Sequence, residues 1–274
     1  MPSARETLAQ HGLRPKKSFG QNFLHDASIA ERIAEAATTP PGGTVLEIGA
    51  GLGALTRPLL ARAARVVAIE RDRDLLPILR AELAADIDSG RLELLEADAA
   101  QVDWRAAMGD GPTPRVVAGN LPYQITGRLL ETCAGLADDI DAAVFMVQLE
   151  VAARLVAPPD GEAYGALSVF AQAAFDVRRL LVARSGAFHP RPEVDSAVVV
   201  LTPRRPRRAR ETDRFREAVR AAFGARRKTL RNAWRGIYGM SREELEARAA
   251  AAGISLDARG ETLAVEDFAR FAGD

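Results

Sequence analysis

The sequence predicts an α/β fold in which a mostly parallel sheet, with helices on both faces, is followed by a small domain of helices only. Short runs rich in Val, Ile and Leu alternate with segments of helical periodicity over about the first 200 residues. This alternation is typical of β–α–β units. No comparable run follows residue 203, and 47% of the 274 residues are hydrophobic, which is enough for a packed core.

The predicted strands are short apolar runs that end at a glycine or a polar residue. Only a loop separates the last two, so we expect a hairpin there, with one antiparallel strand at the sheet edge. The strands are predicted over residues 44–48, 65–69, 91–95, 115–118, 142–147, 174–182 and 196–201.

The helices are predicted from apolar periodicity and capping residues. Asp26 can cap a helix whose apolar face carries Ile29, Ile33, Ala34 and Ala37. Residues 204–274 show helical periodicity alone, so we predict domains over 1–203 and 204–274, with residues 1–25 as a basic N-terminal segment. Further helices are predicted up to residue 60, over 74–83, 127–133 and 150–156, and in the second domain over 213–223, 241–252 and 265–271.

Composition excludes several classes of protein. No apolar run reaches the roughly 18–20 residues of a membrane span, and the N-terminus lacks the apolar core of a signal peptide. We therefore expect a cytoplasmic protein without membrane contact, and nothing demands more than a monomer. Cys133 is the only cysteine and the three histidines are far apart in sequence, so we expect no metal site.

A zero net charge conceals a strongly basic segment. Residues 204–235 contain thirteen Lys and Arg but only three Asp and Glu. Such clustering predicts a basic face that binds a polyanion such as nucleic acid. The alternative is that these arginines only solvate the protein surface.

A glycine-rich turn and a following acid predict a site for an adenosine moiety. Gly49 and Gly51 lie in a turn after the first predicted strand, where glycine lets a ligand approach the backbone. Glu70 ends the next strand, 21 residues after Gly49, where a carboxylate can accept both ribose hydroxyls. A tight turn that needs glycine only for packing is the alternative.

The spacing favours S-adenosylmethionine over a dinucleotide as the ligand. Gly53 follows Gly51 by two residues, whereas a dinucleotide turn places its third glycine three residues on. Glu47 precedes the turn, and an acid is more favourable beside a cationic methionine moiety than beside a pyrophosphate. Asp98 ends the third strand and can accept from an adenine amino group, cap a helix, or both.

The most specific motif is Gly119-Asn120-Leu121-Pro122-Tyr123. The exocyclic amine of adenine is a poor nucleophile because its lone pair is delocalised. The Asn120 side-chain oxygen and the Leu121 carbonyl can accept its N–H groups, Pro122 can stiffen the turn, and Tyr123 can stack on the base. An ordinary Asn-Pro turn after a strand is the alternative.

A proline-rich loop precedes the last predicted strand, over residues 188–196. Phe188 can supply the second face of a stack around an extruded base. The alternative interpretation is that Phe188 is a buried anchor that holds the loop.

Taken in order along the chain, these motifs resemble those of the small-subunit ribosomal RNA adenine N6,N6-dimethyltransferases. The resemblance covers nearly the whole chain, and Ala50 and Gln124 are small departures from it. It is carried by residues 17–24, 47–51, 69–70, 98–99, 119–123, 188–196 and 223–232.

The resemblance implies a Rossmann-like class I methyltransferase sheet, S-adenosylmethionine as donor, and 16S rRNA within the small ribosomal subunit as partner. The acceptors would be two adjacent adenosines near the 3′ end, each methylated twice at N6. It implies cofactor contacts from Asn22, Leu24, Gly49, Glu70, Asp98 and Asn120. From the residues themselves we also expect a cofactor contact from Gly51 and catalytic roles for Asn120, Leu121, Pro122, Tyr123 and Phe188. From their positive charge we expect RNA contacts from Lys16, Lys17, Arg226, Arg227, Lys228 and Arg231.

Three other functions stay open at this point. The macrolide-resistance 23S rRNA adenine methyltransferases share the glycine turn and an Asn-x-Pro-Tyr motif, although residues 188–196 and 226–232 favour the small-subunit enzymes. A nucleic-acid-binding factor that has lost catalysis is a second alternative. An NAD-dependent oxidoreductase is the third, and the glycine spacing disfavours it.

Overall fold

The computed structural model describes residues 4–225 and 227–273. These residues divide into two compact units. The first comprises the chain up to Ala152 together with Arg178–Thr202, and the second comprises Ala153–Val177 together with the chain from Pro203. The chain enters the second unit for the last time at residue 203, next to the predicted domain boundary. Residues 153–177, which were predicted to belong to the first domain, are part of the helical unit.

The first unit is built on a seven-stranded sheet within the described chain, with strand order β4-β3-β2-β5-β6-β9-β7. β2, β3, β4, β5 and β6 run parallel, and β9 pairs antiparallel with β6. The antiparallel strand predicted for this end lies one place inside the edge, between β6 and β7. The strands are β2 Thr44–Ile48, β3 Arg65–Glu70, β4 Leu92–Glu96, β5 Arg115–Asn120, β6 Ala142–Gln148, β7 Phe175–Ala183 and β9 Ser196–Pro203.

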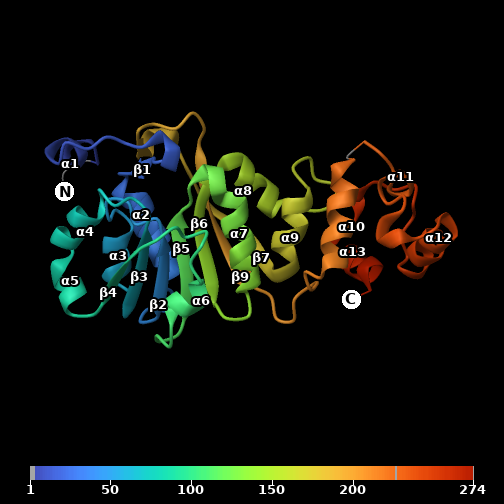
Figure 1. Cartoon of the computed structure of the whole chain (residues 1–274), viewed down its shortest axis with the longest axis horizontal. Coiled ribbons are helices and arrows are strands. Elements are labelled where there is room, and N and C mark those ends of the chain that lie inside the picture. Colours follow the sequence, from blue (N-terminus) through green and yellow to red (C-terminus); the bar gives the residue numbers. More distant parts are fainter. Residues whose placement is uncertain (1–3, 226, 274) are drawn as a thin grey trace. The chain divides into compact units, whose positions relative to one another are not determined.

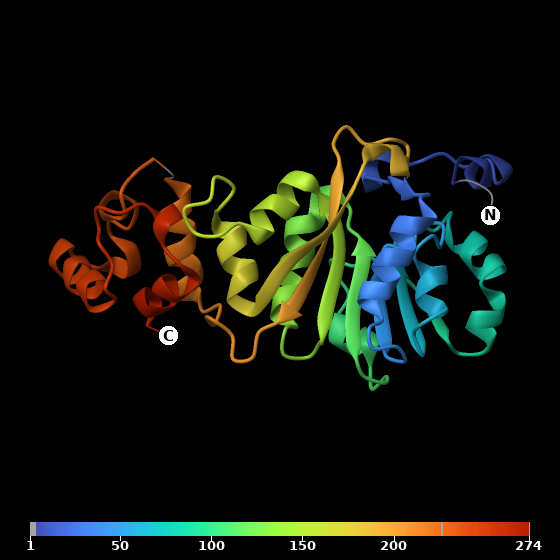
Figure 2. The same cartoon turned by 180° about the vertical axis from the view of Figure 1, so that it is seen from behind.

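Helices cover both faces of this sheet, as predicted. Figure 2 shows α2 (Ala27–Ala37) and α3 (Thr56–Leu60) in front of the strands, and Figure 1 shows α6 (Trp104–Met108) and α7 (Thr126–Gly135) on the opposite face. Asp26 caps α2, because its carboxylate accepts from the backbone N–H groups of Ser28 and Ile29. The remaining helices of this unit are α1 Ala4–Gln10, α4 Leu76–Glu82, α5 Ala84–Asp88 and the start of α8 Leu149–Val156.

A second, two-stranded sheet lies above the carboxyl ends of the main strands (Figure 1). It joins β1 (Phe23–Leu24) to β8 (Phe188–His189) in antiparallel pairing. Sequence periodicity predicts neither strand, because each has only two residues. The pairing fixes the end of the N-terminal segment above the main sheet.

The second unit is helical and has its own core. Tyr164, Phe215, Trp234 and Phe268 are fully buried in it, and Trp234 stacks on Phe271 at 3.9 Å between ring centroids. The core includes Tyr164 and the buried face of α9, which explains why residues 153–177 belong to this unit. Its helices are α9 Ala166–Ala174, α10 Asp213–Gly224, α11 Leu230–Ala233, α12 Arg242–Ala251 and α13 Val265–Ala272.

Candidate active site

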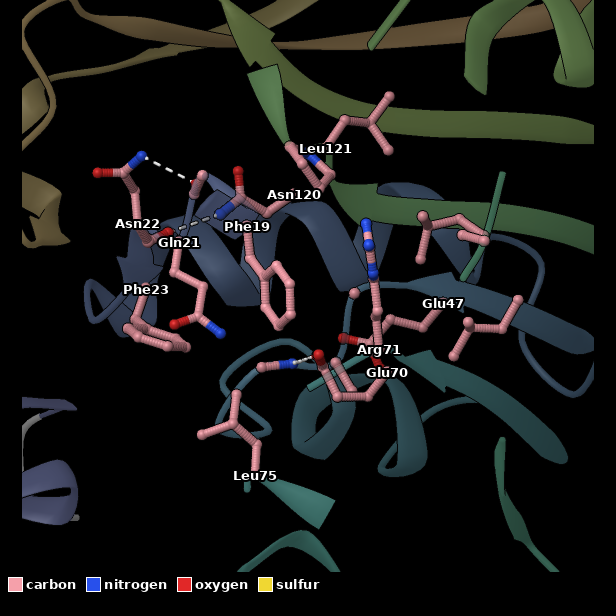
Figure 3. Close-up of a pocket in the computed structure, with 18 of the residues that line it drawn as sticks. Phe19, Gln21, Asn22, Phe23, Glu47, Glu70, Arg71, Leu75, Asn120 and Leu121 are labelled. Carbon is pink, nitrogen blue, oxygen red and sulfur yellow. Dashed lines mark hydrogen bonds between the residues drawn. The ribbon is translucent and has the colours of Figure 1, made fainter. Parts of the chain in front are cut away.

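A cavity lies in the first unit where the carboxyl ends of β2, β3 and β5 meet (Figure 3). Ligands bind at this place in open α/β sheets, because the strand-to-helix turns there leave a crevice. The N-terminal segment supplies a further wall, residues 18–24. The predicted residues that line the cavity are Asn22, Leu24, Gly49, Gly51, Glu70, Asp98, Asn120, Leu121, Pro122 and Tyr123.

The turn after β2 needs glycine at two positions. Gly49 and Gly51 have φ of +78° and +58°, a region that side chains rarely adopt. A Cβ on Gly51 would also lie 3.3 Å from the Phe23 ring, so the turn and the N-terminal segment approach closely. The backbone can therefore face a ligand without an intervening side chain.

Glu70 ends β3 and braces this turn. Its Oε2 accepts from the Gly51 N–H at 2.7 Å (Figure 3). Its Oε1 accepts from the Asp72 N–H, also at 2.7 Å. Burial raises the pKa of Glu70, and these two backbone hydrogen bonds oppose that rise. Each carboxylate oxygen keeps a lone pair beyond the one it uses here. Glu70 can therefore hold the turn and also accept hydroxyl groups from a bound sugar.

Glu47 is a buried acid without a hydrogen-bond partner. It is 1% exposed, and neither carboxylate oxygen bonds to any described residue. Burial raises its pKa to about 7, and the nearby Glu70 raises it further; the Thr56 hydroxyl lies close enough to lower the pKa in part, although it makes no hydrogen bond. Glu47 lines the cavity, so a cationic ligand would supply the missing partner.

Asp98 caps a turn rather than an α-helix. Its Oδ1 accepts from the Ala100 N–H at 3.0 Å, and the following residues form hydrogen-bonded turns. Its other oxygen lies 3.4 Å from the Arg71 guanidinium. The carboxylate still lines the cavity, so capping and ligand contact are compatible at this residue.

The motif at the carboxyl end of β5 presents an oriented amide. Asn120 Nδ2 donates to the backbone oxygen of Asn22 at 3.0 Å (Figure 3). Because the amide nitrogen is engaged, Oδ1 is the atom available to accept from a ligand. Tyr123 is fixed as well, because its hydroxyl lies 2.8 Å from that of the fully buried Ser196 on β9. Burial raises the pKa of Tyr123, and the Ser196 hydrogen bond opposes it.

Phe188 does not line the cavity. It is 3% exposed, pairs with Leu24 between β8 and β1, and belongs to the core of the first unit. In this conformation Phe188 therefore serves as a buried anchor for the proline-rich loop and not as a stacking face for a base.

A family model described as "Ribosomal RNA adenine dimethylase" matches residues 12–272. The chain belongs to this family. It is 46% identical to "Ribosomal RNA small subunit methyltransferase A" of Anaeromyxobacter sp. (strain K), over 98% of this chain and 96% of that protein. It is also 46% identical to the protein of the same name from Moorella thermoacetica, over 96% and 93%.

Two solved structures have a similar fold. The crystal structure of a dimethyladenosine transferase from Plasmodium falciparum has a TM-score of 0.75 and 24% identity, covering 91% of this chain and 95% of that one. The crystal structure of the 23S rRNA methyltransferase ErmE has a TM-score of 0.70 and 28% identity, covering 92% and 98%. The predicted class I methyltransferase fold is confirmed.

The basic residues predicted for this adenine dimethylase fall into different environments. Lys17, Arg227 and Lys228 are exposed, whereas Arg226 lies outside the described residues. Arg231 pairs with Glu246 at 2.7 Å and with Asp257 at 3.3 Å. The Lys16 ammonium is also engaged within the protein, by Asp72 and Asp74.

Several residues at the site are missing from the sequence prediction. Phe19 and Gln21 line the cavity, and the Phe19 ring lies 4.8 Å from the Arg71 guanidinium. Asp72 binds Lys16 and Gln21. The two acids of Glu70-Arg71-Asp72 were the sequence signal for Asp72, but only Glu70 has a spacing from the glycine turn that indicates a ligand contact.

The described residues contain neither a metal-binding cluster nor a membrane-spanning helix. Among residues 4–225 and 227–273, no three His, Cys, Asp or Glu side chains gather into a group that could hold a metal ion. None of the helices in these ranges is long and apolar enough to cross a membrane.

Proposed function

We propose that this chain transfers methyl groups from S-adenosylmethionine to N6 of two adjacent adenosines near the 3′ end of 16S rRNA in the small ribosomal subunit. Each adenosine would become N6,N6-dimethyladenosine. The family match and the names of the relatives support the substrate. The observation that carries the proposal is the Asn120 side chain, which lines the cavity and whose amide nitrogen donates to the Asn22 carbonyl, so that its oxygen is the atom left to accept from a base.

The residues around the cavity fit this cofactor. Glu70 can accept the ribose hydroxyls, and Asp98 can accept from the adenine amine. Glu47 is a buried acid that lacks a partner, which suits a ligand with sulfonium and ammonium charges. Asn22 and Leu24 would cover the bound cofactor, and Gly49 and Gly51 would let it approach the backbone.

Asn120 would activate the acceptor by geometry. S-adenosylmethionine, when bound, would supply an electrophilic methyl group, and the electrons of the broken C–S bond would stay on the sulfur of the neutral thioether product. The Asn120 oxygen and the Leu121 carbonyl would accept the two N6–H groups, which favours a tetrahedral nitrogen with its lone pair available. No base is needed before attack, since the proton can leave N6 for water afterwards, so positioning and electrostatics provide the acceleration.

Aromatic side chains would hold the extruded base. Tyr123 lines the cavity with its hydroxyl fixed by Ser196, so its ring can serve as one stacking face. A second face from Phe188 stays a prediction, which requires β8 to shift from its paired position.

The helical unit and the N-terminal segment would bind the RNA. Lys17, Arg227 and Lys228 are exposed, and with Arg226 they make the predicted phosphate contacts. Arg231 would contribute less, because two carboxylates already neutralise it. We propose that the chain acts as a monomer, in the cytoplasm where small subunits mature.

The test uses small subunits from a strain that lacks this methylation, incubated with the protein and S-adenosylmethionine. N6 dimethylation blocks Watson–Crick pairing, so it stops reverse transcriptase. Stops at two adjacent adenosines near the 16S 3′ end are expected. Stops on added 23S rRNA alone would assign the resistance-type activity, and cofactor binding without any stop would leave a binding factor.

A further inference from the structure

The N-terminal segment that covers the cavity is fastened at both ends. We define residues 16–24 as the cover segment. Its far end is held by the β1–β8 pairing and by the hydrogen bond from Asn120 to Asn22. Its near end is held through Asp72, a residue of the loop that follows β3.

Asp72 makes two side-chain contacts with the cover segment. Its Oδ1 accepts from the Lys16 ammonium at 2.5 Å, and its Oδ2 accepts from Gln21 Nε2 at 2.6 Å. Asp72 is 1% exposed. Burial raises its pKa, but the hydrogen bonds from Lys16 and Gln21 outweigh it, so the pKa is lowered and the carboxylate is charged. A buried charge with these partners is strongly held in place.

The same residue contacts the acid predicted to bind the cofactor. The Asp72 N–H donates to Glu70 Oε1 at 2.7 Å. Gln21 is fixed twice, because its Oε1 also accepts from the Lys16 N–H at 2.7 Å. One residue therefore contacts both parts of the site: the Asp72 side chain holds the cover segment, and its backbone N–H holds Glu70.

We propose that Asp72 is a positioning residue that latches the cover segment over the cavity and thereby sets how long the bound nucleoside cofactor stays. This rests on the proposed function for the identity of the cofactor. The apparent dissociation constant is the intrinsic constant divided by the fraction of closed molecules. Weakening the latch lowers that fraction, so affinity falls through faster dissociation. Lys16 is thus part of the latch instead of an RNA contact.

The test compares Asp72→Asn with Lys16→Met and with the double variant. Asn at this position keeps an acceptor for the Asp74 N–H but loses the charge that binds Lys16. Asp74→Asn is the matched control, because it removes a neighbouring charge from Lys16 and leaves the Asp72 contacts in place. Its half-exposed side chain predicts an effect below about twofold.

Calorimetry with S-adenosylmethionine, stopped-flow dissociation and hydrogen exchange of residues 16–24 are the readouts. Asp72→Asn should weaken affinity about tenfold, mainly by faster dissociation, and should raise KM for the cofactor with kcat within about twofold. Exchange of the cover segment should speed up in the unliganded protein. The double variant should be no weaker than Asp72→Asn alone, because Lys16→Met removes a contact that Asp72→Asn has already removed, and the other partner of Lys16, Asp74, contributes little.

Two results would overturn the latch: cover-segment exchange unchanged in Asp72→Asn, or affinity within twofold of wild type in both single variants. If Asp72→Asn does not fold, Lys16→Met tests the same contact from a partly exposed side chain. The exchange measurement needs no cofactor. A wild-type chain that fails to bind S-adenosylmethionine would therefore refute the proposed function, whereas unchanged exchange would refute the latch.

Discussion

Glu47→Gln should make folding stability less dependent on pH. A glutamate with a pKa of 4.5 in the unfolded chain and about 7 in the folded one binds more protons when folded. Its cost is absent below about pH 4.5, grows as pH rises, and is complete above about pH 7. At about 1.4 kcal/mol per tenfold change in proton affinity, the full cost is about 3 kcal/mol. Glutamine does not ionise, so the variant escapes this cost.

The measurement is urea unfolding of wild type and variant at pH 5 and pH 8.5. At pH 5 the ionisation cost is about 1 kcal/mol. The free energy of unfolding of the variant, relative to that of the wild type, should therefore rise by about 2 kcal/mol from pH 5 to pH 8.5. A Trp234→Phe background leaves Trp104, which is buried in the same unit as Glu47, as the only tryptophan. Its fluorescence then reports unfolding of that unit.

Glu35→Gln is the matched control, because Glu35 is exposed on α2. It should leave the pH dependence unchanged. The buried glutamine amide carries its own cost, but that cost is the same at both pH values and cancels in the comparison. If Glu47→Gln and wild type differ by the same free energy at pH 5 and pH 8.5, then Glu47 does not titrate with a raised pKa and the reasoning fails.

The remaining predictions concern activity and binding. Asn120→Ala should cut methyl transfer about 10²-fold with the fold intact, and wild-type turnover would remove Asn120 from the mechanism. Glu70→Ala should weaken S-adenosylmethionine binding at least tenfold by calorimetry and cost about 1–3 kcal/mol of stability, because two backbone N–H groups lose their acceptor. Unchanged affinity would contradict the ribose contact. Arg227→Ala with Lys228→Ala should lower the salt dependence of log K for RNA by about 1–2, and an equal slope would mean that neither residue contacts phosphate.

The strands were predictable because their cores are short apolar runs bounded by polar residues. β2 occupies the predicted range, 44–48, and the other six strands of the main sheet differ from their predicted ranges by one or two residues at their ends. The order of the strands was predicted only in part, since the sequence indicated an antiparallel strand at one end of the sheet but not its neighbours. That β9 lies inside β7 depends on tertiary pairing, and local periodicity carries no information about it.

Residues at strand ends were predictable because the topology of a parallel sheet brings them together. Glu70, Asp98 and Asn120 lie at the carboxyl ends of three different strands and line one cavity. The Lys16 contact with Asp72 spans 56 residues of sequence, so charge alone suggested an RNA contact. The burial of Phe188 was equally hidden, since it depends on a two-residue strand.

The hydrogen bond between Asn120 and Asn22 links closure of the cavity to the chemistry proposed for it. An amide can present either its oxygen or its nitrogen to an acceptor site, and only the oxygen can accept from an adenine amine. Donation from Nδ2 to the Asn22 carbonyl selects the productive orientation, because it uses the nitrogen elsewhere. That carbonyl lies at the far end of the cover segment, which the pairing of β1 with β8 holds in place. The far end therefore orients the amide while the near-end latch encloses the cofactor, so loss of the β1–β8 pairing would leave Asn120 free to rotate and loss of the latch would not.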